Sequence, residues 1–476
     1  MDDAHDGRSE RQDRATPGGG MAIEIPDPIP SYDSAEQANP PVVLTRPGHP
    51  IRRADIDPDA LRIMSRLQRM GFVAYLCGGA VRDLMLGRKP KDFDVATDAR
   101  PGQIRKRFAN VYVIGRRFRL AHVHFPGGKI IEVATFRREP ERGDDPAPAL
   151  PAAAGGETPP AAAFEPRELP DPHAIYGTPR EDAFRRDITI NALFYDPEID
   201  AVIDYVGGLE DMRRRRVRTI GDPGTRFDED PVRVWRVLRH AARLGFDIDP
   251  ETGRAIASHR HLIATAPGSR LYEEFNKDLA YETRVVFQAL RANGLLRHIL
   301  GRAGLAYEAD PALFDRLASL LDVEERARRE GFLLAIEEMY ALVFWPWLEP
   351  EFESGGEDMV PVLTAAFQNA AMRMTIPKTL KSNAVQILVL VEGLIRALRT
   401  GRLRAALLHR AHLPQATRLA FLIETGRPPA DHETFETLFR AAHPGAQPEP
   451  RQGRRRRRRR RKKGGGGNGG TTPQGA

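Results

Sequence analysis

The chain has 476 residues, of which 41% are hydrophobic, and a formal net charge of +7 at pH 7. This length allows two or three domains with apolar cores. No segment approaches the roughly 20 consecutive apolar residues that a membrane helix requires, and the first residues are charged where a secretory signal would be apolar, so we expect a cytoplasmic protein. The single cysteine, Cys77, excludes an intramolecular disulfide and a Cys-based zinc site.

The first part of the chain predicts a disordered extension followed by a folded domain. Residues 1–45 are rich in Pro, Gly, Asp and Ser and lack apolar periodicity. From Asp57, apolar residues at helical spacing predict a helix that stops at Gly71. Strand and helix patterns then alternate through KIIEVATF, which ends at Phe136. The fold class is therefore α+β, with an N-terminal α/β head at residues 46–215 that contains a mixed sheet of about five strands.

The rest of the folded region predicts helices. Residues 143–173 are rich in Pro, Ala, Gly and acidic residues and predict a flexible loop within the head. Strand patterns resume in ITINALFYD and AVIDYVGG, and from Phe227 to about Phe439 the patterns are almost wholly helical. We expect a helical neck at residues 216–290 and a helical body at residues 291–445.

A basic, low-complexity tail closes the chain at residues 446–476, and we predict that it is disordered. Residues 451–463 hold nine Arg and two Lys and no acidic residue, and without these eleven charges the rest of the chain has a net charge of −4. The positive charge is thus local rather than a property of the fold. Such a tail predicts a polyanionic partner.

Two carboxylates are the sharpest chemical feature of the head. Asp92 and Asp94 are two residues apart in KDFDVAT, a predicted strand, so their side chains would point to the same face. Adjacent carboxylates repel each other and are stable mainly when a divalent cation lies between them. An isolated Asp-x-Asp is more often a pair of acids on a solvated edge strand, so the neighbouring residues decide between the two interpretations.

Those neighbours favour a phosphate and Mg²⁺ site. Gly78 and Gly79 lie at a predicted strand-to-helix turn, where backbone amides can approach phosphate closely, and Arg82 follows them. A two-metal displacement needs a third carboxylate nearby, and Glu132 in the strand IIEVATF is the candidate.

Three ordered motifs carry a resemblance to a known family. They are GGAVRDLMLG with KDFDVAT (78–97), RRDITINALFY (185–195) and EDPVRVWRVLRHAARLGF (229–246). Together they resemble the class II nucleotidyltransferases, the group that holds bacterial poly(A) polymerases and CCA-adding enzymes.

The resemblance implies roles for particular residues. It implies two Mg²⁺ ions held by Asp92, Asp94 and Glu132, with Asp187 as a further catalytic residue. It implies that the nucleotide is bound by Gly78, Gly79, Arg82, Arg186, Asn191, Asp230, Arg233 and Arg236. On a helix, Asp230 and Arg233 would share a face and present an acceptor and a donor to the base, with Arg236 on the same stripe. The alternative for this stripe is an amphipathic helix with surface salt bridges.

Further segments are similar to the bacterial poly(A) polymerase I family rather than to CCA-adding enzymes. They are VIGRRFRLAHVHF (113–125), YGTPREDAFRRD (176–187), LVFWPWLEP (342–350) and MTIPK (374–378). The activity that this resemblance implies is template-independent polyadenylation of RNA 3′ ends with ATP, which would mark RNA for decay. A CCA-adding or A-adding tRNA nucleotidyltransferase and a catalytically inactive RNA-binding relative remain alternatives.

The basic tail agrees with an enzyme that accepts many RNA ends. Its cations would neutralise several phosphates and give sequence-independent, salt-dependent affinity for RNA. The expected RNA-binding residues are Arg454, Arg455, Arg456, Arg457, Arg458, Arg459, Arg460, Arg461, Lys462 and Lys463. A solubilising tail, or a contact to an acidic protein, is the alternative.

Overall fold

The computed structural model describes residues 40–115, 119–138, 176–353, 359–370, 373–427, 429 and 434–446. The predicted loop at 143–173 and nearly all of the basic tail lie outside these residues, so both stay predictions. The described residues of 1–321 and 368–376 form one compact unit, and those of 322–367 and 377–476 form a second. None of the helices that the structure describes is long and apolar enough to cross a membrane.

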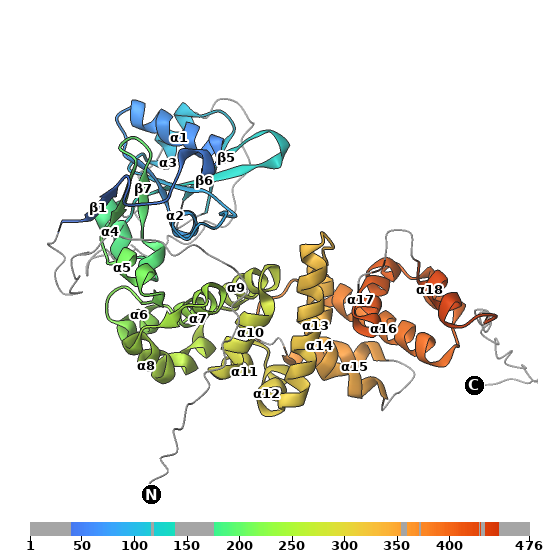
Figure 1. The fold of residues 1–476 in the computed structure, drawn as a ribbon. Coiled ribbons are helices and arrows are strands. Elements are labelled where there is room, and N and C mark those ends of the chain that lie inside the picture. Colours follow the sequence, from blue (N-terminus) through green and yellow to red (C-terminus); the bar gives the residue numbers. More distant parts are fainter. Residues whose placement is uncertain are drawn as a thin grey trace, which may run out of the picture. The chain divides into compact units, whose positions relative to one another are not determined.

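The first unit begins with an eight-stranded mixed sheet, drawn in the blue to green part of the ribbon (Figure 1). Its strands are β1 (Val42–Thr45), β2 (Ala74–Cys77), β3 (Asp94–Thr97), β4 (Val111–Ile114), β5 (Leu120–His124), β6 (Ile130–Thr135), β7 (Phe194–Asp196) and β8 (Ala201–Asp204). Their order is β1-β8-β7-β2-β3-β6-β5-β4. All neighbouring pairs are antiparallel except β3 with β6, which is parallel.

The predicted α+β class is confirmed, but the sheet has eight strands rather than about five. The clearest departure is β1, because its residues Val42–Thr45 fall within the predicted disordered extension. This strand pairs with Ala201–Asp204, more than 150 residues away. Four residues give too little apolar alternation to announce a strand, so its existence depends on the distant partner.

Helix α1 (Pro58–Arg69) illustrates how local sequence fixes the head. Asp57 caps it by accepting hydrogen bonds from the amides of Asp59 and Ala60, and Pro58 occupies the first helical position. Gly71, with φ +83°, ends it as predicted. The apolar face of α1 packs on β2 and β3, while α2 (Gly79–Met85) and α3 (Pro101–Arg107) pack beside β2 and beside β4 and β5.

The remaining elements are almost all helices, as predicted from Phe227 onward. In the first unit they are α4 (Pro179–Phe184), α5 (Gly208–Arg213), α6 (Pro223–Glu229), α7 (Val232–Leu244), α8 (Pro250–His259), α9 (Gly268–Ala280), α10 (Thr283–Ala292), α11 (Leu296–Ile299), α12 (Arg302–Ala309) and most of α13 (Pro311–Arg329). A short pair of strands, β9 (Arg216–Val217) and β10 (Asp247–Ile248), flanks α7. Helix α7 packs against α9 and α10.

Every regular element described in the second unit is a helix. It contains the end of α13 with α14 (Ile336–Glu353), α15 (Met359–Ala370, with its last residues in the first unit), α16 (Lys378–Thr400), α17 (Leu413–Thr425) and α18 (Phe435–Ala442). Helix α16 packs against α14, α17 and α18. The predicted head and neck fall in the first unit, whereas the predicted body at 291–445 is divided between the two units.

Candidate active site

The turn between β2 and α2 has a backbone conformation that only glycine adopts easily. Gly78 has φ +72° and ψ −138°, a region that side chains disfavour. A Cβ atom on Gly78 would also lie 3.3 Å from Nη1 of Arg186. The predicted strand-to-helix turn at Gly78 and Gly79 is therefore confirmed, and it brings the backbone close to a guanidinium.

Three carboxylates lie around the start of β3. The parallel pairing of Val95 with Val133 places Asp94, the first residue of β3, level with Glu132 on β6. Asp92 precedes the strand and is exposed, so the expectation that both aspartates lie on the strand is wrong by two residues. Burial, followed by the negative charges of Glu132 and Asp92, raises the pKa of Asp94 to about 6.

The expected set of three metal ligands is not assembled in this structure. Among the residues it describes, no group of three or more His, Cys, Asp or Glu side chains is gathered as a metal site. Glu132 is 48% exposed at its side chain and its Oε1 lies 3.4 Å from Nε2 of His122. The crowded negative charge at Asp94 is nevertheless what a divalent cation relieves, so the donor set fits Mg²⁺ chemically.

A cleft of about 630 Å³ opens beside Asp94. It is lined by Gly78, Gly79, Asp94, Arg185, Arg186, Asp187, Asn191, Asp230, Arg233, Arg236, Arg270, Glu273, Glu274 and Lys277. Nine of the residues predicted from the sequence therefore share one cleft. Of the residues predicted for the metal and the nucleotide, three, Asp92, Glu132 and Arg82, are not among the lining residues.

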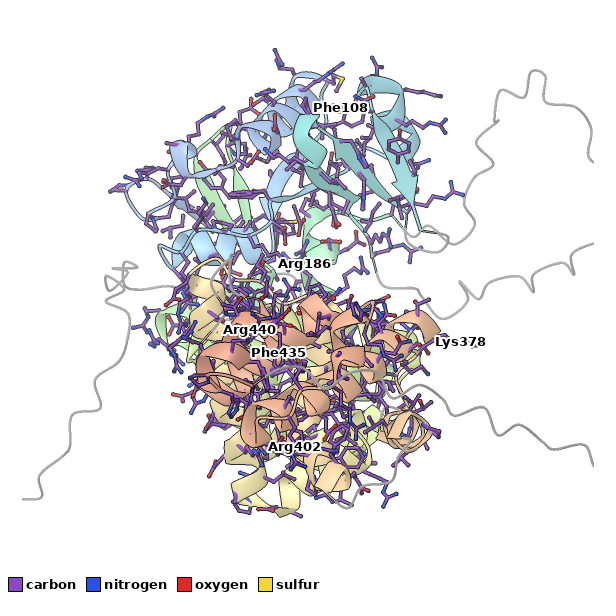
Figure 2. The ribbon with its side chains drawn as sticks, turned by 90° about the vertical axis from the view of Figure 1, so that its right-hand side faces the viewer. Phe108, Arg186, Lys378, Arg402, Phe435 and Arg440 are labelled. Atoms are coloured by element: carbon purple, nitrogen blue, oxygen red, sulfur yellow. The ribbon has the colours of Figure 1, made fainter. Side chains whose placement is uncertain are left out.

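Arg82 contributes through a neighbour instead. Its Nη1 donates to Oδ1 of Asn191 at 2.5 Å, while its Nη2 pairs with Asp83 at 2.7 Å. Arg186 donates from Nη1 to the carbonyl oxygen of the same Asn191 at 3.1 Å, and its Nε and Nη2 both bind Asp182. Figure 2 shows Arg186 at the lower end of the head. Asn191 is thus held from two sides, with both guanidiniums oriented by carboxylates.

Asp187 is held by a cation from the neck helix. Its Oδ2 accepts from Nε of Arg236 at 2.6 Å, and its Oδ1 accepts from the amide of Ile188 at 2.9 Å. Burial alone would raise the pKa of Asp187, but Arg236 holds that pKa well below its usual range. Burial, and then the charges of Arg82 and Arg236, lowers the pKa of nearby His240 well below its ordinary value. At neutral pH the site therefore contains an ionised Asp187 and an uncharged His240.

A buried ionic network between α7 and α9 supports Arg236. Glu274 on α9 lies 3.4 Å from Nη1 of Arg236 and also pairs with Arg239, which pairs in turn with Asp278. Trp235, fully buried, donates from Nε1 to Asp278 at 2.5 Å. Burial would raise the pKa of Glu274, but Arg239 and then Arg236 lower that pKa to about 2. The network keeps Arg236 at a fixed position over Asp187.

The predicted base-reading pair does not lie on one helix. Asp230 ends α6 with extended dihedrals, φ −147° and ψ 93°, and α7 begins at Val232. Pro231 is the physical reason, because the residue before a proline is disfavoured in helical conformation. Asp230 and Arg233 still line the same cleft, where Nη2 of Arg270 donates to Oδ2 of Asp230 at 2.8 Å.

Two segments that contribute residues to this cleft match known family models. Residues 74–218 match the family described as the poly A polymerase head domain, and residues 245–303 match the family described as the probable RNA and SrmB-binding site of polymerase A. The chain is a homologue of bacterial poly(A) polymerase I and of the CCA-adding enzymes. Poly(A) polymerase I of Salmonella typhimurium strain LT2 is 40% identical over 314 residues, which is 64% of each chain, and that of Escherichia coli O157:H7 is 47% identical over 256 residues, or 52% of each chain.

The CCA-adding enzymes are more distant relatives. That of Bacillus licheniformis is 35% identical over 253 residues, or 52% of this chain and 57% of the relative. The crystal structure of the Bacillus stearothermophilus CCA-adding enzyme in complex with CTP has a TM-score of 0.57 and 27% identity, and covers 81% of this chain and 82% of its own. The present chain spans between half and just under two thirds of the length of these curated relatives.

The sequence interpretation missed the wall of the cleft that α9 provides. Arg270, Glu273, Glu274 and Lys277 all come from this helix, inside the segment that matches the RNA-binding family. Their spacing of three and four residues places them on one face of a helix. That spacing was visible in SRLYEEFNK, but it is also the pattern of a solvated helix face, and only the packing of α9 against α7 separates the two.

Proposed function

We propose that this chain is a poly(A) polymerase, which adds AMP from ATP to RNA 3′ ends without a template. The observation that carries the proposal is the cleft that joins Asp94 to a set of arginines from the head, α7 and α9. Phosphoryl transfer needs this combination of a carboxylate for metal binding and cations for phosphate. Relatives named poly(A) polymerase I are also more similar to the chain, at 40% and 47% identity, than the CCA-adding enzyme at 35%.

In this proposal, Asp92, Asp94 and Glu132 hold two Mg²⁺ ions beside the glycine turn. When bound, Mg²⁺ would lower the pKa of the RNA 3′-hydroxyl and neutralise charge on the triphosphate. The 3′-hydroxyl attacks the α-phosphate of ATP, the bond from the α-phosphorus to the bridging oxygen breaks, and pyrophosphate leaves. The raised pKa of Asp94 supports this assignment, because burial and then the charges of Glu132 and Asp92 disfavour its ionised form, which a bound cation would stabilise.

The remaining head residues position the nucleotide. The turn at Gly78 and Gly79 lets the triphosphate approach the backbone closely, and Arg186 lies directly beside Gly78. Asn191 lines the cleft and is held there by Arg82 and Arg186, and in this proposal it contacts the ribose. The role of Asp187 is to remain ionised and hold the Arg236 guanidinium, which contributes positive charge toward the phosphates.

Asp230 and Arg233 are proposed to contact the base. A carboxylate accepts from an exocyclic amino group and a guanidinium donates to the neighbouring ring nitrogen, a pattern that both adenine and cytosine satisfy. This pair therefore selects against guanine and uracil but does not by itself separate ATP from CTP. Arg270 restrains Asp230 through its 2.8 Å contact, which favours one orientation of the acceptor.

A CCA-adding or A-adding tRNA nucleotidyltransferase is the second candidate. The match to the enzyme solved in complex with CTP, which covers 81% of this chain, favours it. Against it stand the higher identity to relatives named poly(A) polymerase I and the basic tail, which suits RNA ends of many sequences. We propose that Arg454–Lys463 bind RNA without sequence preference and that the tails added mark RNA for decay.

The test is a primer-extension assay with the full chain and Mg²⁺. Each nucleoside triphosphate is offered separately to an unstructured RNA and to a tRNA that lacks its terminal CCA. Long ladders with ATP on the unstructured RNA are the expected result. Incorporation of CTP and a halt after CCA on the tRNA would assign the chain to the second candidate, and the absence of extension with any triphosphate would refute both.

A further inference from the structure

The head contains a second pocket, apart from the catalytic cleft. It has a volume of about 550 Å³ and lies between α1, the segment after α3 and the end of β5, a size typical of ligand sites. It shares no lining residue with the catalytic cleft. Figure 2 shows Phe108, one of its lining residues, at the end of the head remote from Arg186. A ligand in this pocket would therefore not compete with the incoming nucleotide.

The walls of this pocket carry uncompensated positive charge. Arg53, Arg62, Arg66 and Arg69 line it, and no Asp or Glu does. Arg62 pairs with Asp59 at 3.0 Å. For the other three arginines, no carboxylate partner exists in the part of the chain that the structure describes. An anionic ligand would meet three guanidiniums whose charge is not already neutralised.

Two planar side chains that line the pocket lie against each other. The Arg66 guanidinium lies over the Phe108 ring, 4.8 Å from its centroid. Because Arg66 covers one face of the Phe108 ring, a nucleobase would stack on the outer plane of the guanidinium or on the other face of the ring. His124 also lines the pocket, and its Nε2 is buried without a hydrogen-bond partner among the described residues. The pocket thus combines the Arg66–Phe108 pair, on which a base could stack, with the unpaired Nε2 of His124 and several arginine side chains.

The arrangement of the arginines fits a chain of phosphates better than a single one. Arg62, Arg66 and Arg69 succeed one another at intervals of four and three residues along α1, so they form one stripe. Side chains at this spacing have Cβ atoms about 5–6 Å apart. A free nucleotide would use one end of such a stripe, whereas a polynucleotide would use all of it.

We propose that this pocket binds a nucleotide of single-stranded RNA, with its base against Phe108 and its neighbouring phosphates on the α1 arginines. The nucleotide lies upstream of the 3′ end in the cleft, a placement that rests on the proposed activity. Binding itself does not depend on that activity. The site would retain RNA on the enzyme between successive additions, in parallel with the basic tail.

The first experiment measures binding of a fluorescent 20-nucleotide oligo(A) to the full chain by anisotropy, without ATP. The double variant Arg66→Gln, Arg69→Gln removes two phosphate contacts while keeping helix-forming residues of similar length. Each contact to single-stranded nucleic acid contributes about 0.7 to the slope of log affinity against log salt. We expect the magnitude of the slope to be smaller by about 1.4 in the double variant than in the wild type. The affinity of the variant for oligo(A) should then be about 25-fold weaker than that of the wild type at about 0.1 M salt and equal to it near 1 M.

Two further variants separate the pocket from general charge. The control Arg105→Gln, Lys106→Gln removes the same charge from exposed positions on neighbouring α3 that do not line the pocket, and we expect its slope to be unchanged. Phe108→Leu keeps an apolar side chain but removes the ring, and we expect binding about fivefold weaker with the same salt slope. Equal loss in the control and the double variant would overturn the proposal, as would wild-type affinity in both pocket variants.

The extension assay provides an independent readout. With 20-nucleotide primers, the double variant should show a raised KM and an unchanged kcat, whereas with trinucleotide primers both should match the wild type. If the wild type extends no primer, the proposed function fails while the binding measurements still decide the pocket. If the double variant loses affinity for polyglutamate but retains it for oligo(A), the occupant is an acidic peptide and the RNA assignment is wrong.

Discussion

Replacing Glu274 by Gln should destabilise the first unit in a pH-dependent way. Glu274 has an exposed side-chain fraction of 3% and pairs with Arg239 and Arg236, which lower its pKa from 4.5 to about 2. Because the folded-state pKa lies below the unfolded one, the stabilisation is complete above pH 4.5 and is lost as pH falls toward 2. A pKa shift of this size contributes about 3 kcal/mol to the free energy of unfolding at pH 7 and about 1 kcal/mol at pH 3.

The assay is urea denaturation followed by the fluorescence of Trp235, which lies in the same network through Asp278. Trp345 and Trp347 are replaced by Phe in every protein compared, so that the signal reports this region alone. The matched control is Glu273→Gln, the same change at the adjacent exposed position, where we expect less than about 0.5 kcal/mol. The quantity compared is the difference in unfolding free energy between Glu274→Gln and its parent. If this difference were the same at pH 7 and pH 3, the arginines would not stabilise the ionised carboxylate and the reasoning would fail.

Three other changes test the site and the tail. Asp94→Asn should slow nucleotide addition on the order of 10³-fold, because it removes a proposed metal ligand. The variant should unfold at the same or a higher temperature than the wild type, because the substitution removes a buried charge and its repulsion by neighbouring carboxylates. An addition rate near that of the wild type would remove Asp94 from the mechanism. Gly78→Ala should cost about 1–3 kcal/mol in unfolding free energy, because its φ of +72° disfavours a side chain and the methyl group would lie 3.3 Å from Arg186. Gly87→Ala, whose methyl group meets nothing within 4 Å, should cost less, and a reversed order would contradict the packing argument. Deleting residues 451–476 should weaken RNA binding at physiological salt and flatten its salt dependence with kcat at saturating RNA unchanged, and equal affinity with and without these residues would assign the tail another role.

The catalytic cleft depends on an ionic network that includes Glu274, a residue outside the three sequence motifs. Asp187, in the head, is held by Arg236 on α7, and Arg236 is held by Glu274 on α9. Each link is a charged pair with little exposure, so the loss of one partner would leave another charge buried and uncompensated. Residues more than 80 positions apart therefore determine the orientation of one carboxylate.

Local sequence was sufficient for elements whose signals lie within a few residues. The helix start after Asp57, the stop at Gly71 and the turn at Gly78 all appeared where the local pattern predicted them, because helix ends and positive φ depend on neighbouring residues. The motif residues that line the cleft were also predictable, since they occur in short ordered segments. Pro231 carried enough information to place Asp230 outside a helix, so that error came from ignoring a signal that the sequence contained.

What remained hidden depended on contacts between distant segments. Strand β1 exists because Val42–Thr45 pair with β8, and four residues cannot specify a partner more than 150 positions away. The face that α9 turns to the cleft was decided by its packing on α7, since charges at helical spacing suit solvent and a binding site equally. The sequence by itself determined the fold class and the motif residues, through local backbone preferences and apolar spacing, whereas only tertiary packing decided which charges met one another inside the cleft.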